Sequence, residues 1–184
     1  MQARTDDLSL LSIAADVQGV EAAGPYVEAA RPDFTTAVDS TNMLGYLFGY
    51  KAVPNGVVLN SEGTVLYARY GGFSVHDEES VERVDAALKG KQIQAAQAPG
   101  SAPIPEEDAR RVRELLRQGA EAVGRDSTRT AQLWREALRL DPNNYVIRKQ
   151  IWALEHPDKF YPEIDWDWQH QQLRSERLAE RAAR

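Results

Sequence analysis

The segment Phe48–Gly72, FGYKAVPNGVVLNSEGTVLYARYGG, contains the clearest local pattern in the chain. Two runs rich in β-branched and aromatic residues, Gly56–Asn60 and Thr64–Tyr70, are separated by Ser-Glu-Gly. A three-residue connection with glycine in third place is typical of a tight antiparallel hairpin, in which Gly63 takes the left-handed conformation. The segment therefore predicts a β-hairpin that follows a Val53-Pro54 turn.

The residues before this hairpin predict a strand and a helix. Leu8–Ala15 is a nearly continuous apolar run, which is typical of a strand buried on both faces of a parallel sheet. Gly24-Pro25 then opens a helix, because proline suits a first helical turn, and Pro32 closes it. The expected buried stripe of this helix consists of Tyr26, Val27, Ala29 and Ala30.

Two further helices frame the hairpin. Phe34–Val38 is expected to form a short extended piece, and Ser40 or Thr41 can cap a helix over Asn42–Phe48. After the hairpin, the acidic run Asp77-Glu78-Glu79 favours the N-terminus of a helix that continues through Leu88. The order is strand, helix, helical turn, proline loop, hairpin, helix.

This order, over Leu8 to Gly90, resembles the thioredoxin-like superfamily, in particular its TlpA/ResA-like, AhpC/TSA-related branch. The resemblance implies an incomplete α/β thioredoxin-like fold of the order β-α-β-β-α. The elements that carry it are Phe48-Gly49-Tyr50, Val53-Pro54, Val57–Asn60, Gly63 and Val65–Gly71.

The family resemblance implies a thiol or selenol oxidoreductase that reduces disulfides or peroxides. In that family a Cys-x-x-Cys, a single cysteine or a selenocysteine attacks the substrate, and the residue before a cis proline offers its backbone to that substrate. Val53 and Pro54 would fill these substrate-binding roles. The chain contains no cysteine, so no catalytic residue is assigned and we expect no activity in disulfide reduction. The alternative is a non-catalytic protein-interaction module.

The family's first strand and its redox helix have no counterpart in this sequence. That strand normally lies between the Leu8–Ala15 strand and the hairpin, so its loss would leave two parts of one sheet unpaired. We therefore expect a homodimer, formed by domain swapping or sheet completion. One hypothesis is a selenocysteine codon read as a stop, which would make Met1 an artificial start and the chain a truncation. The DNA upstream of Met1 tests it.

Composition excludes several classes of function. A net charge of −6 argues against a nucleic-acid partner, and no apolar run is long enough to span a bilayer. The N-terminus lacks the features of a signal peptide, so a cytoplasmic location is expected. His76, His156 and His170 are scattered, and we therefore predict no metal site and no cofactor.

A composition shift at Ile93–Pro105, rich in Ala, Gln and Pro, predicts a linker. It separates a thioredoxin-like domain over 1–92 from an all-α module over 106–184. The helices expected in and just before this module are Pro105–Val123, Thr128–Leu140, Tyr145–His156 and Trp168–Ala182.

The helical module resembles one tetratricopeptide unit. Trp134, Ala137 and Pro142 sit where that repeat has a bulky residue, a small residue and its terminating proline, while Leu115, Gly119 and Ala122 fit its first helix with a one-residue shift. Since one repeat cannot bury a continuous core, we expect it to pack on the αβ domain or on a partner.

The C-terminal tail is rich in aromatic and charged residues. Asp165 and Asp167 flank Trp166 in what we expect to be an extended segment, where a Trp anchored in a groove between solvated aspartates is favoured over a catalytic carboxylate pair. The basic residues alternate with glutamates and predict solvated helix faces: Arg148, Lys149, Arg174, Arg177, Arg181 and Arg184.

Overall fold

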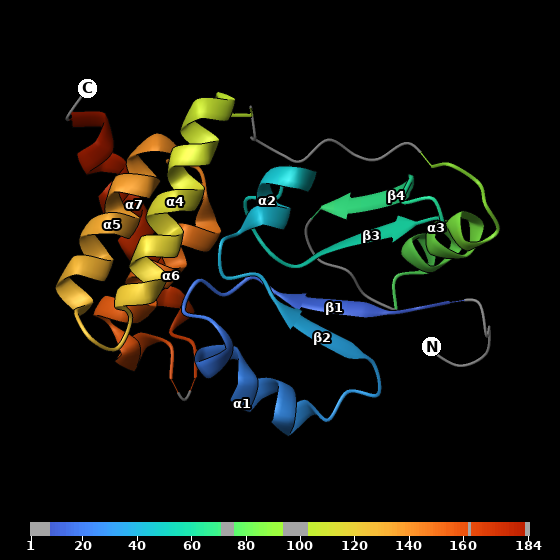
Figure 1. Ribbon diagram of the computed structural model, residues 1–184, viewed down its shortest axis with the longest axis horizontal. Coiled ribbons are helices and arrows are strands. Elements are labelled where there is room, and N and C mark those ends of the chain that lie inside the picture. Colours follow the sequence, from blue (N-terminus) through green and yellow to red (C-terminus); the bar gives the residue numbers. More distant parts are fainter. Residues whose placement is uncertain (1–7, 71–75, 94–102, 162, 183–184) are drawn as a thin grey trace.

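The computed structural model describes residues 8–70, 76–93, 103–161 and 163–182. Within these ranges the chain is mixed α/β, with two small sheets followed by an all-helical half. Figure 1 shows the helical half at one end and the two strand pairs beside it, with β1 and β3 as the inner strands. None of the described helices is both long and apolar enough to cross a membrane.

The first sheet pairs β1 (Leu11–Ala14) with β2 (Thr35–Val38) in parallel, with Leu11 opposite Thr35. The strand is shorter than the predicted Leu8–Ala15, and the prediction that it is buried on both faces was wrong. Leu11 is 55% exposed, and Leu8 and Leu10 are exposed as well. Among the described residues β2 pairs along one edge of β1, and such pairing covers neither face of the strand, from which the side chains project.

Helix α1 (Val20–Ala30) begins five residues before the predicted start, so Pro25 lies inside the helix and does not open it. The predicted buried stripe was also wrong, because Ala23 is the buried residue of this helix while Tyr26, Ala29 and Ala30 are exposed. The helix ends just before Pro32, as predicted, with Arg31 in the left-handed conformation.

Helix α2 (Met43–Phe48) is capped by a residue that the sequence did not suggest. The carboxylate of Asp39 accepts hydrogen bonds from the main-chain N–H groups of Met43 at 3.0 Å and Leu44 at 2.8 Å. The prediction that Ser40 or Thr41 caps this helix was therefore wrong. Asp39, which precedes the helix by four residues, accepts hydrogen bonds from the free N–H groups of the first turn.

The predicted hairpin is present as β3 (Asn55–Leu59) and β4 (Val65–Tyr70), which pair antiparallel. Gly63 has a φ of 80°, the left-handed conformation expected for the turn. The Asn60 side chain stabilises the turn by accepting a hydrogen bond from the Thr64 N–H at 2.8 Å. Helix α3 (Glu78–Leu88) packs on the hairpin and matches its predicted bounds.

The two sheets, β2-β1 and β3-β4, are separate: no described hydrogen bond joins them. The specific thioredoxin-like fold stays a prediction.

The helical half contains α4 (Glu106–Ala122), α5 (Ser127–Leu140), α6 (Tyr145–Glu155), the short 3-10 helix η1 (Pro157–Lys159) and α7 (Trp166–Ala182). Trp134, on α5, is completely buried where α5 packs on α4. A Cβ at Gly119 would lie 2.2 Å from Nε1 of Trp134, so glycine is required for the two helices to approach this closely. The predicted linker lies mostly outside the described residues, but Ile104 packs on the helical core.

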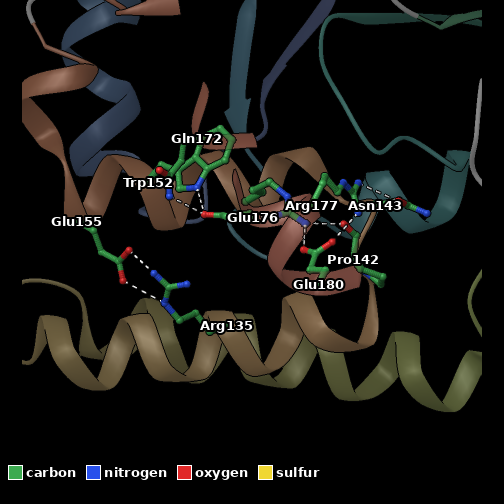
Figure 2. A network of polar contacts seen from close by, with 10 residues as sticks. Arg135, Pro142, Asn143, Trp152, Glu155, Gln172, Glu176, Arg177 and Glu180 are labelled. Atoms are coloured by element: carbon green, nitrogen blue, oxygen red, sulfur yellow. Dashed lines mark hydrogen bonds and ion pairs between the residues drawn. The ribbon is translucent and has the colours of Figure 1, made fainter. Parts of the chain in front are cut away.

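Helix α7 is held to α6 by a buried polar network (Figure 2). The side chain of Arg148 is 1% exposed and forms ion pairs with Glu176 and Glu180. It also donates to the main-chain carbonyl of Pro142 at 2.8 Å. The prediction that Arg148 lies on a solvated helix face was wrong, because carboxylates from a helix 28 to 32 residues later in the chain neutralise it.

The start of α7 corrects the interpretation of the tail. Trp166 and Asp167 belong to the helix, and Asp165 accepts the main-chain N–H of Trp168 at 2.9 Å, which lowers its pKa. Trp166 is exposed under the ammonium group of Lys149 and is not anchored in a groove. The packed tryptophan is Trp168, which contacts the rings of Trp152, His156 and Phe160.

Candidate functional site

The predicted substrate-binding residues, Val53 and Pro54, lie on the surface in the loop between α2 and β3. The peptide bond between them is cis, as the resemblance implies. Val53 is 62% exposed, and Ala52 and Pro54 are exposed as well. The loop therefore presents a short apolar surface at the entrance to β3, and its role in binding stays a prediction.

The residue that begins this loop is fixed by the helical half. The main-chain carbonyl of Lys51 accepts the N–H of Tyr145 at 2.8 Å, and its Nζ lies 2.5 Å from Oδ1 of Asp141. One contact comes from Asp141, directly after α5, and the other from Tyr145, the first residue of α6. Two residues before Val53, the chain is therefore held by its main chain and by its side chain.

Asp141 is the centre of this contact, and its side chain is 1% exposed. Its second oxygen, Oδ2, accepts from the Tyr46 hydroxyl at 3.3 Å and from Nδ2 of Asn144 at 3.0 Å. Burial, and then the charge of Asp141, raise the pKa of Tyr46. The guanidinium of Arg113 lies 5.6 Å from the centre of the Tyr46 ring. The carboxylate thus has three donors, two of them from the αβ half. We call Tyr46, Lys51, Asp141 and Asn144 the Asp141 cluster.

An aromatic group supports the same loop from the hairpin side. The rings of Tyr50 and Tyr70 meet edge to face at 5.3 Å, and the Tyr70 hydroxyl donates to the main-chain carbonyl of Phe48 at 3.0 Å. The Tyr50 hydroxyl is buried, and burial raises its pKa to about 12. Tyr50 therefore supports the loop through its ring, and Tyr70 supports it through both its ring and its hydroxyl.

The inner strands of the two sheets form the second feature of the candidate site. Leu11 and Ile13 on β1 and Leu59 on β3 expose apolar surface. Figure 1 shows β1 and β3 running in opposite directions. An added strand would therefore be parallel to one of them and antiparallel to the other.

The described residues contain no metal-binding group of three or more His, Asp and Glu side chains. The hollow lined by residues of α3 and the chain after it, including Glu82, Arg83 and Lys91, contains no residue of the Val53–Pro54 loop.

Comparison of the chain with protein-family models, with curated proteins and with solved structures gave no significant match.

Sequence reasoning placed Val53 and Pro54 but missed the Asp141 cluster. A signal was present in Asp141-Pro142-Asn143-Asn144, a polar turn directly after an amphipathic helix. We interpreted that turn as a helix stop only. The two residues of the αβ half that donate hydrogen bonds to Asp141 lie about 90 residues earlier in the sequence, and no local pattern connects them with it.

Proposed function

We propose that this chain is a non-catalytic protein-binding module of thioredoxin-like ancestry, and that it forms a homodimer through a strand of a second copy added at the edge of β1. The observation that carries the proposal is the division of the αβ half into two separate two-stranded sheets. Two-stranded sheets are only marginally stable by themselves, so further strand pairing would stabilise both.

The edge of β1 has the properties of a strand acceptor. Its residues pair with β2 alone among the described strands, and an edge strand presents a row of main-chain donors and acceptors to another chain. Leu11 and Ile13 add apolar surface next to that edge. Main-chain hydrogen bonds would then supply affinity, and the apolar side chains would select the bound segment.

A second copy is the partner that the geometry supports best. Every copy carries the same edge, so two copies can pair about a two-fold axis with each contact made twice. In this proposal the helical half, tetratricopeptide-like at Trp134, Ala137 and Pro142, packs on the αβ half of its own chain.

The second candidate is a part in thiol or selenol redox chemistry, as the family resemblance implies. The order of α2, the Val53-Pro54 loop, the hairpin and α3 supports it. In that case Val53 and Pro54 would contact a protein substrate through their exposed surface. The thiol is not among the residues of this chain, so no chemical step is assigned to them.

Sedimentation velocity over a hundredfold range of protein concentration tests the homodimer. We expect reversible self-association, weakened at least roughly tenfold by Leu11→Lys, since each copy would lose a buried leucine and gain a charge at the edge. The matched control is Leu178→Lys, at an exposed leucine on α7, which should associate like the wild type. A wild-type chain that stays monomeric throughout, or equal effects of both variants, would contradict the proposal.

A further inference from the structure

Each sheet is attached to the helical half at a place of its own. Val17, three residues after β1, is completely buried in the helical core, and Gln18 bonds the Gln150 side chain at 3.1 Å. The hairpin is attached separately, through Tyr46 on α2 and Lys51 in the loop that leads to β3. Since no hydrogen bond among the described residues joins the sheets directly, these two attachments determine where β1 and β3 lie relative to each other.

The second attachment is the more specific of the two. Asp141 accepts Lys51 on one carboxylate oxygen and Tyr46 on the other, while the neighbouring Tyr145 N–H bonds the Lys51 carbonyl. The side chain of Lys51 is only 15% exposed. A buried ammonium group that loses its carboxylate, or a buried carboxylate that loses its ammonium group, is strongly disfavoured. The pair therefore holds the loop in one place and disfavours alternatives.

We infer that Asp141 is a positioning residue: through Lys51 and Tyr46 it fixes the Val53–Pro54 loop and the start of β3 relative to β1, so that the helical half sets the geometry into which a strand would bind. The inference rests on the proposed function only for what it says about strand binding. The positioning itself concerns contacts within one chain.

Amide hydrogen exchange of Lys51→Met tests the positioning. This variant removes the ammonium group but leaves every residue of the helical half unchanged, so that half should still fold. We expect exchange across residues 43–59 to be at least roughly tenfold faster, because loss of one partner of a buried ion pair leaves the other charge uncompensated. Exchange within α4, which does not contain a residue of the Asp141 cluster, should be unchanged, and a general loss of stability would not produce this result.

Two further variants sharpen the test. Lys51→Met combined with Asp141→Asn removes both charges and should recover part of the protection lost in Lys51→Met alone. Glu155→Gln, which breaks the exposed pair with Arg135, is the matched control and should leave residues 43–59 unchanged.

The outcomes separate this inference from the proposed function. Unchanged exchange over 43–59 in Lys51→Met would overturn the positioning role. Faster exchange there, together with at least roughly tenfold weaker self-association, would support both proposals. Faster exchange in a chain that never self-associates would support the positioning role and refute the homodimer.

Discussion

Replacement of Arg148 by methionine tests how helix α7 is attached. Arg148, on α6, contacts Glu176, Glu180 and the carbonyl of Pro142. Methionine retains much of the apolar stem of arginine but none of its donors. The substitution therefore removes the charge from the network with little change in packing volume.

The expected loss in the free energy of unfolding depends on how deeply each charged partner is buried. Removal of one partner of a fully buried ion pair costs about 3–5 kcal/mol, because the other charge is left uncompensated. Arg148 is 1% exposed, but Glu176 is 19% and Glu180 is 31% exposed, so water can solvate part of the released charge. In the variant, Glu176 would still accept the hydrogen bond from the indole N–H of Trp152, which measures 2.6 Å. We therefore expect a loss of about 2–4 kcal/mol in the free energy of unfolding.

Urea unfolding followed by tryptophan fluorescence measures this loss. Trp152 and Trp168 lie at the junction of α6 and α7, with ring centres 5.8 Å apart, so their emission should report separation of α7. The matched control is Arg135→Met, which breaks the exposed pair with Glu155 and should cost less than about 1 kcal/mol. If Arg148→Met cost no more than Arg135→Met, the network would not hold α7 and this reasoning would be refuted.

Two more predictions concern the same half of the molecule. Desolvation opposes ionisation of Glu180, but the hydrogen bonds and charges of Arg148 and Arg177 together outweigh it and hold the pKa of Glu180 below its usual range. The stability that this shift contributes is complete above the unfolded pKa of about 4.3 and is lost as the pH falls through the folded pKa. On acid titration, Glu180→Gln should therefore lose less free energy of unfolding than the wild type. An equal loss in the two proteins would contradict the assignment. Gly119→Ala places a methyl group against Trp134 and should lower the free energy of unfolding by about 1–3 kcal/mol in the same urea titration. Gly24→Ala, in α1, meets no atom within 4 Å and should be neutral or stabilising by up to about 1 kcal/mol, so equal effects of the two would refute the close helix contact.

The helical half could be predicted closely because its signals are local. The amphipathic spacing and polar turns placed α4, α5 and α6 within about one residue of their observed ends, within the usual uncertainty of helix boundaries. Asn144 begins α6 by accepting the N–H of Ile147, which is a contact within one turn. The hairpin was predictable for the same reason, since Gly63 and the three-residue turn determine it.

Burial in the αβ half could not be read from the sequence. An apolar run such as Leu8–Ala15 is buried only if other elements pack on both of its faces, and Leu8, Leu10, Leu11 and Ile13 are exposed. The same limit applies to α1, whose apolar residues recur with the spacing of a helix but are mostly exposed. Periodicity predicts which face of an element is apolar, and the surrounding chain decides whether that face is covered.

The polar contacts that organise the molecule were missed because they are long-range. Arg148 has the sequence context of a solvated arginine, and only the return of α7 places two carboxylates beside it. Asp141 likewise resembles a simple helix-stop residue until the loop at Lys51 reaches it. Charged residues such as these show their role only when the tertiary structure is known.

The most direct test of the central claim is amide hydrogen exchange in β1 at two protein concentrations, one on each side of the self-association measured by sedimentation. The proposal predicts that exchange across Leu11–Ala14 slows at least roughly tenfold at the higher concentration, because an added strand protects the unpaired edge, while exchange in α7 does not change. Exchange in β1 that is independent of concentration would contradict the claim that this edge accepts a strand from a second copy.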